Sequence, residues 1–517
     1  MKRKFMSYFL RNRLFRALAA GLICAGGMVL QASAQNAPQS TVNIAQLRAA
    51  AEQGDAESQL SLGMYYFMGE GGLKQSDADA IKWFQLAAKQ KNYQAQYMLG
   101  IYCMEGRGIK KNEELGTKLI LSAANGGFAE AQYEYASMLA EQNKMSEALP
   151  WMKKAVAQEY YPAFVALGSH YIATAKPGTP EMNQGIQLLM AAASEGDLDA
   201  QLTLGAALVE QKETAAGVVW LEVASMNGAK DVAEALKELK VSPEEACEIA
   251  SVFYHGDGII PKNYQKFKFW AEKSAAENYA GAQTLLGMYY CIGVNHELTP
   301  ERGVEFLEKA AAQNDPEALT LLAICCRNGR GTAQDPKRAI ELLQKAAKQN
   351  YAPAYTQLAF SSLFGSGIVS KEDVTRKLFQ KAGAMNERTA LVFMDYCTKN
   401  SLSFENGPAL LKQIAAAAKA GDAQAQYLMG EIYCDGHGVK MDEKIMVAYY
   451  TMAVKQNYIY ALTELSRLYE MGIYVKENRD VAIQLALKAA EQGDQQALSY
   501  LNSVGQVDAA EQTQNLN

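Results

Sequence analysis

A pattern of about 36 residues recurs along almost the whole chain, and it limits the possible folds more than any other feature. Each copy has a small residue at one fixed position, which we call the small slot. The slot is clearest at Gly63, Gly100, Gly205, Gly287, Ala323 and Gly430, and less regular at Ala136, Gly168, Ala250, Ala359, Met394, Ser466 and Asn502. A fixed period of this length is typical of stacked helix pairs that bury their apolar faces against their neighbours. The pattern predicts an all-α solenoid of about 12 helix-turn-helix repeats and argues against an enzyme.

Residues 91–127 show how one repeat is built. Apolar residues at helical spacing predict a first helix, the A helix, over residues 93–104 and a second, the B helix, over residues 113–124. The turn between them contains Gly-x-Gly. Phosphate-binding loops also contain this motif, but they follow a strand, whereas these glycines follow a helix and recur in register. We therefore expect turn residues with positive φ at Gly106/Gly108, Gly256/Gly258, Gly329/Gly331, Gly365/Gly367 and Gly436/Gly438.

A second regular position lies nine residues before each small slot. Gly and Asn tolerate the left-handed conformation that ends a helix, so this position is the expected C-terminal cap of each B helix. It is occupied by Gly54, Gly127, Gly196, Gly228, Asn278, Asn314, Asn350, Gly421, Asn457 and Gly493. Lys91, Glu159 and Met385 break the rule, and we expect looser caps there.

The first 34 residues have the three regions of a secretory signal peptide. A basic stretch precedes an apolar run over residues 17–30, which is too short to span a bilayer, and Ala32-Ser33-Ala34 forms a small-x-small cleavage pattern. The alternative is an uncleaved membrane anchor. We expect cleavage after Ala34, a linker over residues 35–45, and a periplasmic or secreted protein with no membrane insertion after cleavage.

The charge of the chain narrows its partners. The formal net charge is −6 and becomes −12 without residues 1–34, which carry six basic and no acidic side chains. An acidic balance weighs against nucleic acid or an anionic membrane surface as a partner. The carboxylates form no sequence pair that differs from a solvated helix face, so a spread of surface charge is their expected meaning.

The repeat is interrupted once, near residue 240. The stretch 229–240 predicts a helix, but too few residues follow it for a B helix before the next repeat begins. Ser242, Pro243 and Glu245 instead have the spacing of an N-cap, a first-turn proline and a capping box. We expect a first array over residues 46–240 with five repeats and a capping helix, a second array over 241–505 with seven repeats and a capping helix, and a disordered tail over 506–517. The alternative is a continuous solenoid with one distorted unit.

The cysteines and histidines suggest packing rather than chemistry. Most of the seven cysteines beyond residue 34 follow the small slot by two to four positions, so we expect reduced, buried thiols. Cys291 with Cys326, and Cys397 with Cys434, occupy neighbouring slots of stacked A helices. With helix axes about 8–10 Å apart, only side chains that face each other directly can form a disulfide, and the one-residue offset within each pair is expected to turn them apart. Cys434 and His437 have metal-like spacing without a matching pair, so we predict no metal, cofactor or catalytic residue.

The repeats resemble the Sel-1-like repeat family, a relative of the tetratricopeptide repeat. The family pattern appears in AQYLMGEIYCDGHGV, in ALTELSRLYEMGIYV and in WFQLAAKQ, and the resemblance covers roughly residues 45–505. The repeats around Ala136 and Gly205 depart from it, because the shorter EQNKMSE and EQKETAA replace the Gly-x-Gly loop. The resemblance implies a right-handed superhelical solenoid and a role as an adaptor.

These observations favour a non-enzymatic interaction scaffold of the bacterial cell envelope. Its concave face, lined by A helices, is expected to bind a protein or peptide partner, although the sequence does not identify the binding residues. The alternative is a secreted hydrolase acting on cell-wall peptides or β-lactams, an activity assigned to some cysteine-rich relatives. The absence of Ser-x-x-Lys from the sequence weighs against this alternative.

Overall fold

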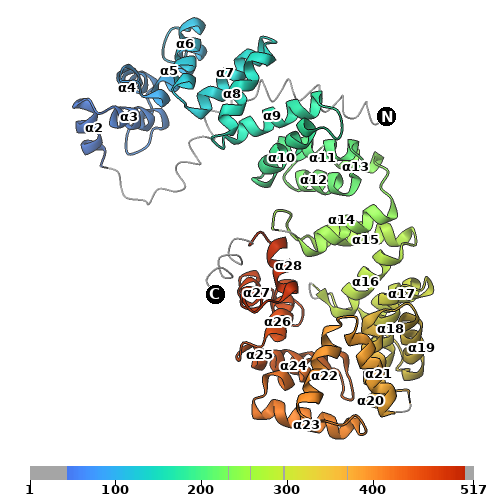
Figure 1. Cartoon of the computed structure of the whole chain (residues 1–517). Helices are drawn as coiled ribbons and strands as arrows, with labels where there is room; N and C mark the ends of the chain where they lie inside the picture. The colour runs from blue at the N-terminus through green and yellow to red at the C-terminus, as the bar shows by residue number, and fades with distance from the viewer. Residues whose placement is uncertain (1–42, 231, 257, 295–296, 369–370, 507–517) are drawn as a thin grey trace. The chain divides into compact units, whose positions relative to one another are not determined.

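The computed structural model describes residues 43–230, 232–256, 258–294, 297–368 and 371–506. The expected signal peptide (1–34) lies outside the described residues, as do nearly all of the linker (35–45) and of the tail (506–517). Every element in the described part of the chain is a helix, as the repeat predicts (Figure 1). The contacts between Cα atoms divide the chain into two compact units, with the boundary between Leu239 and Lys240.

Unit 1 is a series of antiparallel helix pairs, each packed on the next. Its helices are α2 (Ile44–Glu52), α3 (Ala56–Met68), α4 (Asp77–Lys89), α5 (Tyr93–Glu105), α6 (Glu113–Asn125), α7 (Ala129–Glu141), α8 (Met145–Val156), α9 (Tyr161–Thr174), α10 (Pro180–Ser194), α11 (Leu198–Glu210), α12 (Thr214–Met226) and α13 (Val232–Glu238).

Unit 2 repeats the same arrangement. Its A helices are α14 (Pro243–His255), α16 (Ala280–Ile292), α18 (Pro316–Asn328), α20 (Ala352–Leu363), α22 (Arg388–Lys399), α24 (Ala423–Asp435), α26 (Ile459–Met471) and α28 (Gln495–Ser503). Its B helices are α15 (Tyr264–Ala276), α17 (Pro300–Ala312), α19 (Pro336–Lys348), α21 (Glu372–Gly383), α23 (Gly407–Ala420), α25 (Glu443–Val454) and α27 (Arg479–Glu491). How many repeats the sequence assigns to each array stays a prediction.

The small slot is where the A and B helices of one repeat approach most closely. A Cβ added to Gly100 would lie 2.8 Å from the side chain of Ile120 on the partner helix, and one added to Gly205 would lie 2.8 Å from Leu221. Real Cβ contacts are longer, so a larger residue would push the helices apart.

The helix bounds predicted for residues 91–127 are close to the observed ones. Helices α5 and α6 begin at the predicted residues and end one residue beyond the predicted ends.

The caps at the ends of the B helices agree with the prediction where Gly or Asn is present, because all ten of those residues have positive φ. The expectation of looser caps at the exceptions is wrong. Lys91 (φ 63°) and Glu159 (φ 58°) adopt the same left-handed conformation, and Asn386 (φ 59°) replaces Met385 one residue later. The next A helix must start in a fixed direction to pack, and this requirement outweighs the local preference of the cap residue.

Unit 2 begins with a strongly capped helix. The side chain of Ser242 accepts a hydrogen bond from the backbone N–H of Glu245, and the backbone N–H of Ser242 donates to the Glu245 carboxylate at 2.8 Å. Pro243 occupies the first turn. The predicted capping box is therefore confirmed, and it lets α14 start without a preceding B helix.

Side chains in unit 2 also join repeats that are far apart in the sequence. Lys262, before α15, forms an ion pair with Glu470 of α26 at 2.6 Å, so the first repeat of the unit contacts one of the last. Arg388 of α22 pairs with Asp494, the N-cap of α28, at 2.8 Å. All four of these side chains are largely buried. Each repeat of unit 2 packs on its neighbours, and these two ion pairs also join repeats that are distant in the sequence.

Candidate binding pocket

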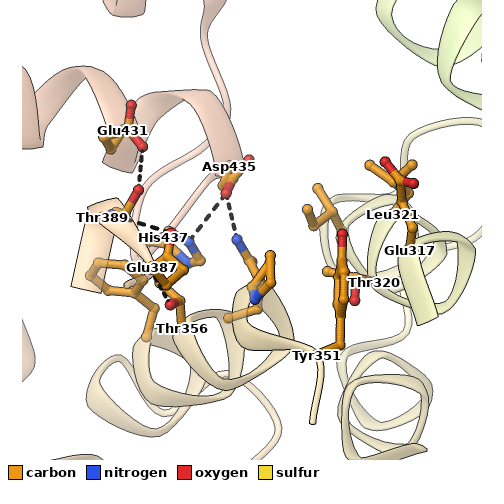
Figure 2. A pocket seen from close by; sticks show the side chains of 14 residues that line it. Glu317, Thr320, Leu321, Tyr351, Thr356, Glu387, Thr389, Glu431, Asp435 and His437 are labelled. Carbon is orange, nitrogen blue, oxygen red and sulfur yellow. Dashed lines mark hydrogen bonds and ion pairs between the residues drawn. The ribbon is translucent and has the colours of Figure 1, made fainter. Parts of the chain in front are cut away.

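A pocket of ≈ 220 Å³ lies on the A-helix face of unit 2, between α18, α20, α22 and α24 (Figure 2). These four helices are the A helices of consecutive repeats, so their equivalent faces converge on one space. The pocket therefore lies where A helices of unit 2 face one another. No binding residue was predicted from the sequence, so each of the following residues is identified by the structure.

One side of the pocket is formed by α18 and α20. Glu317, Leu321 and Ile324 follow one another at helical spacing on α18, with Thr320 beside them, and Phe360 occupies the same face of α20. Most of these groups are apolar or carry a hydroxyl. This side can therefore contact an aliphatic chain and leave polar atoms to its end.

Glu431 of α24 is one of the four carboxyl groups that line the pocket. The hydroxyl of Tyr450 donates a hydrogen bond to one of its oxygens, and the hydroxyl of Thr389 donates to the other at 2.8 Å (Figure 2). Burial, followed by the nearby charge of Glu464, raises the pKa of Glu431 to about 8. At neutral pH this group is therefore mainly protonated, and it can take up charge when a cation approaches.

Asp435, one turn further along α24, remains ionised. Burial alone would raise its pKa, but the neighbouring His437, the charge of Arg327 and a hydrogen bond from Gln357 lower it. Arg327 is buried, with only 4% of its surface exposed, and it donates hydrogen bonds to Gln357 at 2.8 Å and to the carbonyl oxygen of Asp435 at 2.7 Å. Gln357 thus fixes the carboxylate of Asp435, and Arg327 in turn fixes Gln357.

His437 stacks on Phe360 with ring centroids 4.2 Å apart, and its Nε2 lies 3.6 Å from Asp435. Burial, with the charge of Arg327, lowers the pKa of His437 to about 4, so its ring is neutral at pH 7. The sequence predicts no zinc site at Cys434 and His437, and the contacts of His437 with Phe360 and Asp435 do not test that prediction. Among the described residues, no group of three or more His, Cys, Asp or Glu side chains is placed to hold a metal ion.

Glu387 completes the polar lining at the start of α22. Its carboxylate accepts backbone N–H bonds from Thr389 and Ala390, and the hydroxyl of Thr356 also donates to it (Figure 2). Four carboxyl groups thus line the pocket, and no lysine or arginine is among its lining residues. The arrangement favours a ligand with an apolar stem and a cationic end.

The thiols that sequence reasoning singled out lie elsewhere on the A helices. All seven described cysteines are free; five are buried, and Cys247 and Cys434 are partly buried. The sequence places Cys291 and Cys326 at neighbouring slots, but the thiol in contact with Cys291 is that of Cys325, with sulfur atoms 3.8 Å apart. The slant of one A helix against the next moves the contact by one residue from equal slots.

One repeat position changes in character near the pocket. The residue directly after the small slot is apolar or small in most repeats, such as Met64, Ile101 and Met288. In the repeats around α22, α24 and α26 it is charged instead: Asp395, Glu431 and Arg467. Of these three, only Glu431 lines the pocket, so the charged run does not separate the pocket from a solvated helix face.

The repeats match a known protein family. The family model described as Sel1 repeat matches eight segments, which together exceed half of the chain: residues 56–92, 94–128, 246–279, 280–315, 316–351, 352–387, 423–458 and 459–494. The comparison with curated proteins finds no match. In the described part of the chain, no helix combines the length and apolarity needed to cross a membrane.

Two solved structures are similar to this chain over most of its length. One is c5321, a protective antigen present in uropathogenic Escherichia coli strains and displaying an SLR fold; it is 22% identical with a TM-score of 0.34, covering 92% of this chain and 94% of that one. The other is a Sel1 repeat protein from Oxalobacter formigenes, 19% identical with a TM-score of 0.27, covering 94% of this chain and 93% of that one.

Proteins built from Sel1 repeats generally mediate protein–protein interactions and are typically non-enzymatic scaffolds. The matched segments include the A helices α18, α20 and α24, which provide most of the pocket, whereas α22 lies between two matched segments. On the extent of the family match, the chain belongs to the Sel1 repeat family.

Proposed function

We propose that this chain is a non-enzymatic scaffold of the bacterial cell envelope, and that it binds a protein partner through the A-helix face of unit 2. The partner presents a lysine or arginine side chain, which enters the pocket between α18 and α24. The observation that carries this proposal is the pairing of an apolar wall with four carboxyl groups and no lining cation.

The chemistry of a basic side chain fits both parts of the pocket. Its methylene stem packs against Leu321, Ile324 and Phe360, while its charged end reaches Glu387, Glu431 and Asp435. Pairing with a cation would also lower the pKa of Glu431 and release its proton. Binding is therefore expected to release protons near neutral pH, which a neutral side chain in the same place would not cause.

Short peptides that differ only at a central residue test the proposal with the full chain. Peptides with lysine or arginine at that position should bind about tenfold more tightly than peptides with methionine, because one desolvated charge pair is worth at least 1.4 kcal/mol. Isothermal titration in two buffers of different ionisation enthalpy measures both affinity and proton release. Equal affinity for lysine, methionine and glutamate peptides would reject the proposed occupant.

A pair of variants locates the effect. Glu387→Gln should abolish most of the preference for a basic residue, whereas Glu113→Gln should leave it unchanged, because the Glu113 side chain is 67% exposed in unit 1. A photo-cross-linking residue in place of Leu321 then identifies the partner in envelope fractions, with a lysine peptide as competitor. Cross-linking that the competitor does not reduce would place the partner elsewhere.

Location in the envelope is the other half of the proposal. It is supported by the basic, apolar and small-x-small regions of residues 1–34. N-terminal sequencing of the exported protein should begin at Gln35, and a protein that begins at Met1 and stays with the cytoplasmic fraction would contradict export. Neither the described residues nor the comparisons favour the hydrolase alternative.

A further inference from the structure

Neighbouring A helices contact each other at a constant register. The residue four positions after one small slot meets the residue two positions after the next slot. In the first repeats this contact joins Phe67 to Tyr102, with ring centroids 6.3 Å apart, and at the start of unit 2 it joins Tyr254 to Tyr289 at 6.5 Å. The register is a consequence of the helix slant, so it brings together whatever residues occupy these two positions.

Between α16 and α18 the same register brings two thiols together. Cys291 lies four positions after Gly287, Cys325 lies two positions after Ala323, and their sulfur atoms are 3.8 Å apart. The site has little spare room, because a Cβ added to Gly303 would lie 2.5 Å from the Cys291 sulfur. Both cysteines are buried, so the surrounding side chains limit the rotation of the two thiols.

We propose that Cys291 and Cys325 form an oxidisable thiol pair, which closes to a disulfide between α16 and α18 by exchange with a disulfide donor. A sulfur–sulfur bond is about 2.05 Å long, so the sulfurs must approach by less than 2 Å. Rotation of the two side chains with a small shift of one helix achieves this.

The reaction conserves thiols and disulfides. The Cys291 thiolate attacks one sulfur of the donor, which forms a mixed disulfide and releases one donor thiolate. Cys325 then loses its proton and attacks the Cys291 sulfur, which forms the protein disulfide and releases the second donor thiolate. The two protons lost by the cysteines are taken up by the two donor thiolates. The protein pair is oxidised by two electrons, and the donor disulfide is reduced by two.

Either thiol can donate the hydrogen bond that joins the two sulfur atoms, so the reaction balances in the same way whichever cysteine attacks first. Cys326 is an unsuitable partner although it is adjacent in sequence. It is completely buried, and the charge of Arg338 on α19 acts on it, which places it toward the B helix of its own repeat.

The test treats the folded full-length protein with oxidised glutathione, alkylates the remaining thiols and maps tryptic peptides. Residues 274–302 should be linked to residues 310–327, with the loss of two hydrogen masses, and dithiothreitol should reverse the link. Cys326→Ser is the matched control, because it shares the peptide with Cys325 but should leave the link intact. Cys325→Ser should abolish it.

Thermal unfolding provides a second readout that does not depend on peptide recovery. Oxidation should raise the unfolding temperature of the wild type and of Cys326→Ser, and leave that of Cys291→Ala unchanged, because only a closed loop restricts the unfolded chain. A link to Cys326 instead of Cys325 would overturn the proposal. So would two thiols that stay reduced in the folded protein at a glutathione poise that oxidises the same pair after unfolding.

Discussion

The two units use the same repeat but hold their charged side chains in different ways. In unit 1, Arg107 pairs with Asp77 of the preceding repeat, and Gln90 donates a hydrogen bond to Gly54, also one repeat away. In unit 2, Lys262 pairs with Glu470 across 208 positions of sequence, and Arg388 bonds Asp494 across 106. In unit 1 these polar contacts therefore join neighbouring repeats, whereas in unit 2 they also join distant repeats.

This difference shows that a repeat sequence determines the local stack more strongly than the way the stack closes. Contacts between neighbours make stability nearly a sum of terms from successive repeats. Contacts between distant repeats couple those terms, so unit 2 is expected to unfold more cooperatively than unit 1. They also remove charges from water and place them around the pocket, where Arg327 and Asp435 meet from repeats three apart.

The largest effect is expected from Arg388→Ala. The carboxyl side chain of Asp494 is only 2% exposed, and without Arg388 it would remain buried without its cation. The free energy of unfolding of unit 2 should fall by about 3–5 kcal/mol. Urea denaturation with hydrogen exchange of α22 and α28 measures this loss.

The matched control is Lys118→Ala in unit 1. Lys118 and Glu114 form an ion pair with side chains 70% and 81% exposed, so its loss should leave the stability almost unchanged. Similar losses for the two variants would mean that the long-range pair of unit 2 is no different from a surface pair.

The second prediction concerns the contact between the first repeat of unit 2 and its last repeats. Lys262→Ala should lower the free energy of unfolding by about 2–3 kcal/mol, because Glu470 is 10% exposed and loses a cation that is itself 14% exposed. Hydrogen exchange should become faster in α15 and α26 together. Faster exchange in α15 alone would show that the two ends of the unit are not energetically coupled.

The repeats were predictable from the sequence, but these long-range pairs were not. Periodicity relates each residue to the one about 36 positions away, so it predicts the small slot, the caps and the helix bounds. It does not specify the small rotation between successive repeats, which decides whether repeats three or six apart meet. Arg388 and Glu431 therefore looked like solvated helix residues, and the slant of the A helices, which selects Cys325 over Cys326, was equally hidden.

The third prediction is a pH dependence of unit 2 that arises at Glu431. Burial raises the pKa of Glu431 to about 8, above the value of about 4.3 in an unfolded chain. A raised folded-state pKa contributes stability that is fully present below about pH 4 and is lost as the pH rises through about 8. Relative to Glu431→Gln, the wild type should lose at most about 1.4 kcal/mol for each pH unit in this interval.

Urea denaturation of both proteins at about pH 5.5 and about pH 7.5 gives the comparison. Wild type and variant should differ more at the higher pH, with the variant the more stable of the two. Parallel curves would show that the carboxyl group of Glu431 is ionised at neutral pH, and would remove the reason to expect proton release on binding.

The smallest effect is expected at a cap of unit 1. Lys91 holds a left-handed conformation (φ 63°) that costs a residue with a side chain about 1 kcal/mol, whereas the corresponding caps of unit 2 are Gly or Asn. Lys91→Gly should raise the free energy of unfolding of unit 1 by about 0.5–1 kcal/mol. Lys89→Gly, within the last turn of α4, should lower it by a similar amount.

The closure of unit 2 limits how this part of the protein can evolve. An open stack tolerates tandem duplication of one repeat, because each new helix pair finds the same kind of neighbours on both sides. In unit 2, a duplicated repeat between α16 and α26 would move Glu470 away from Lys262 and Val504 away from Gly258, where a Cβ would already lie 3.0 Å from the Val504 carbonyl oxygen. The number of repeats in unit 2 is therefore fixed by its geometry, whereas the length of an open stack is free to drift among descendants of one gene.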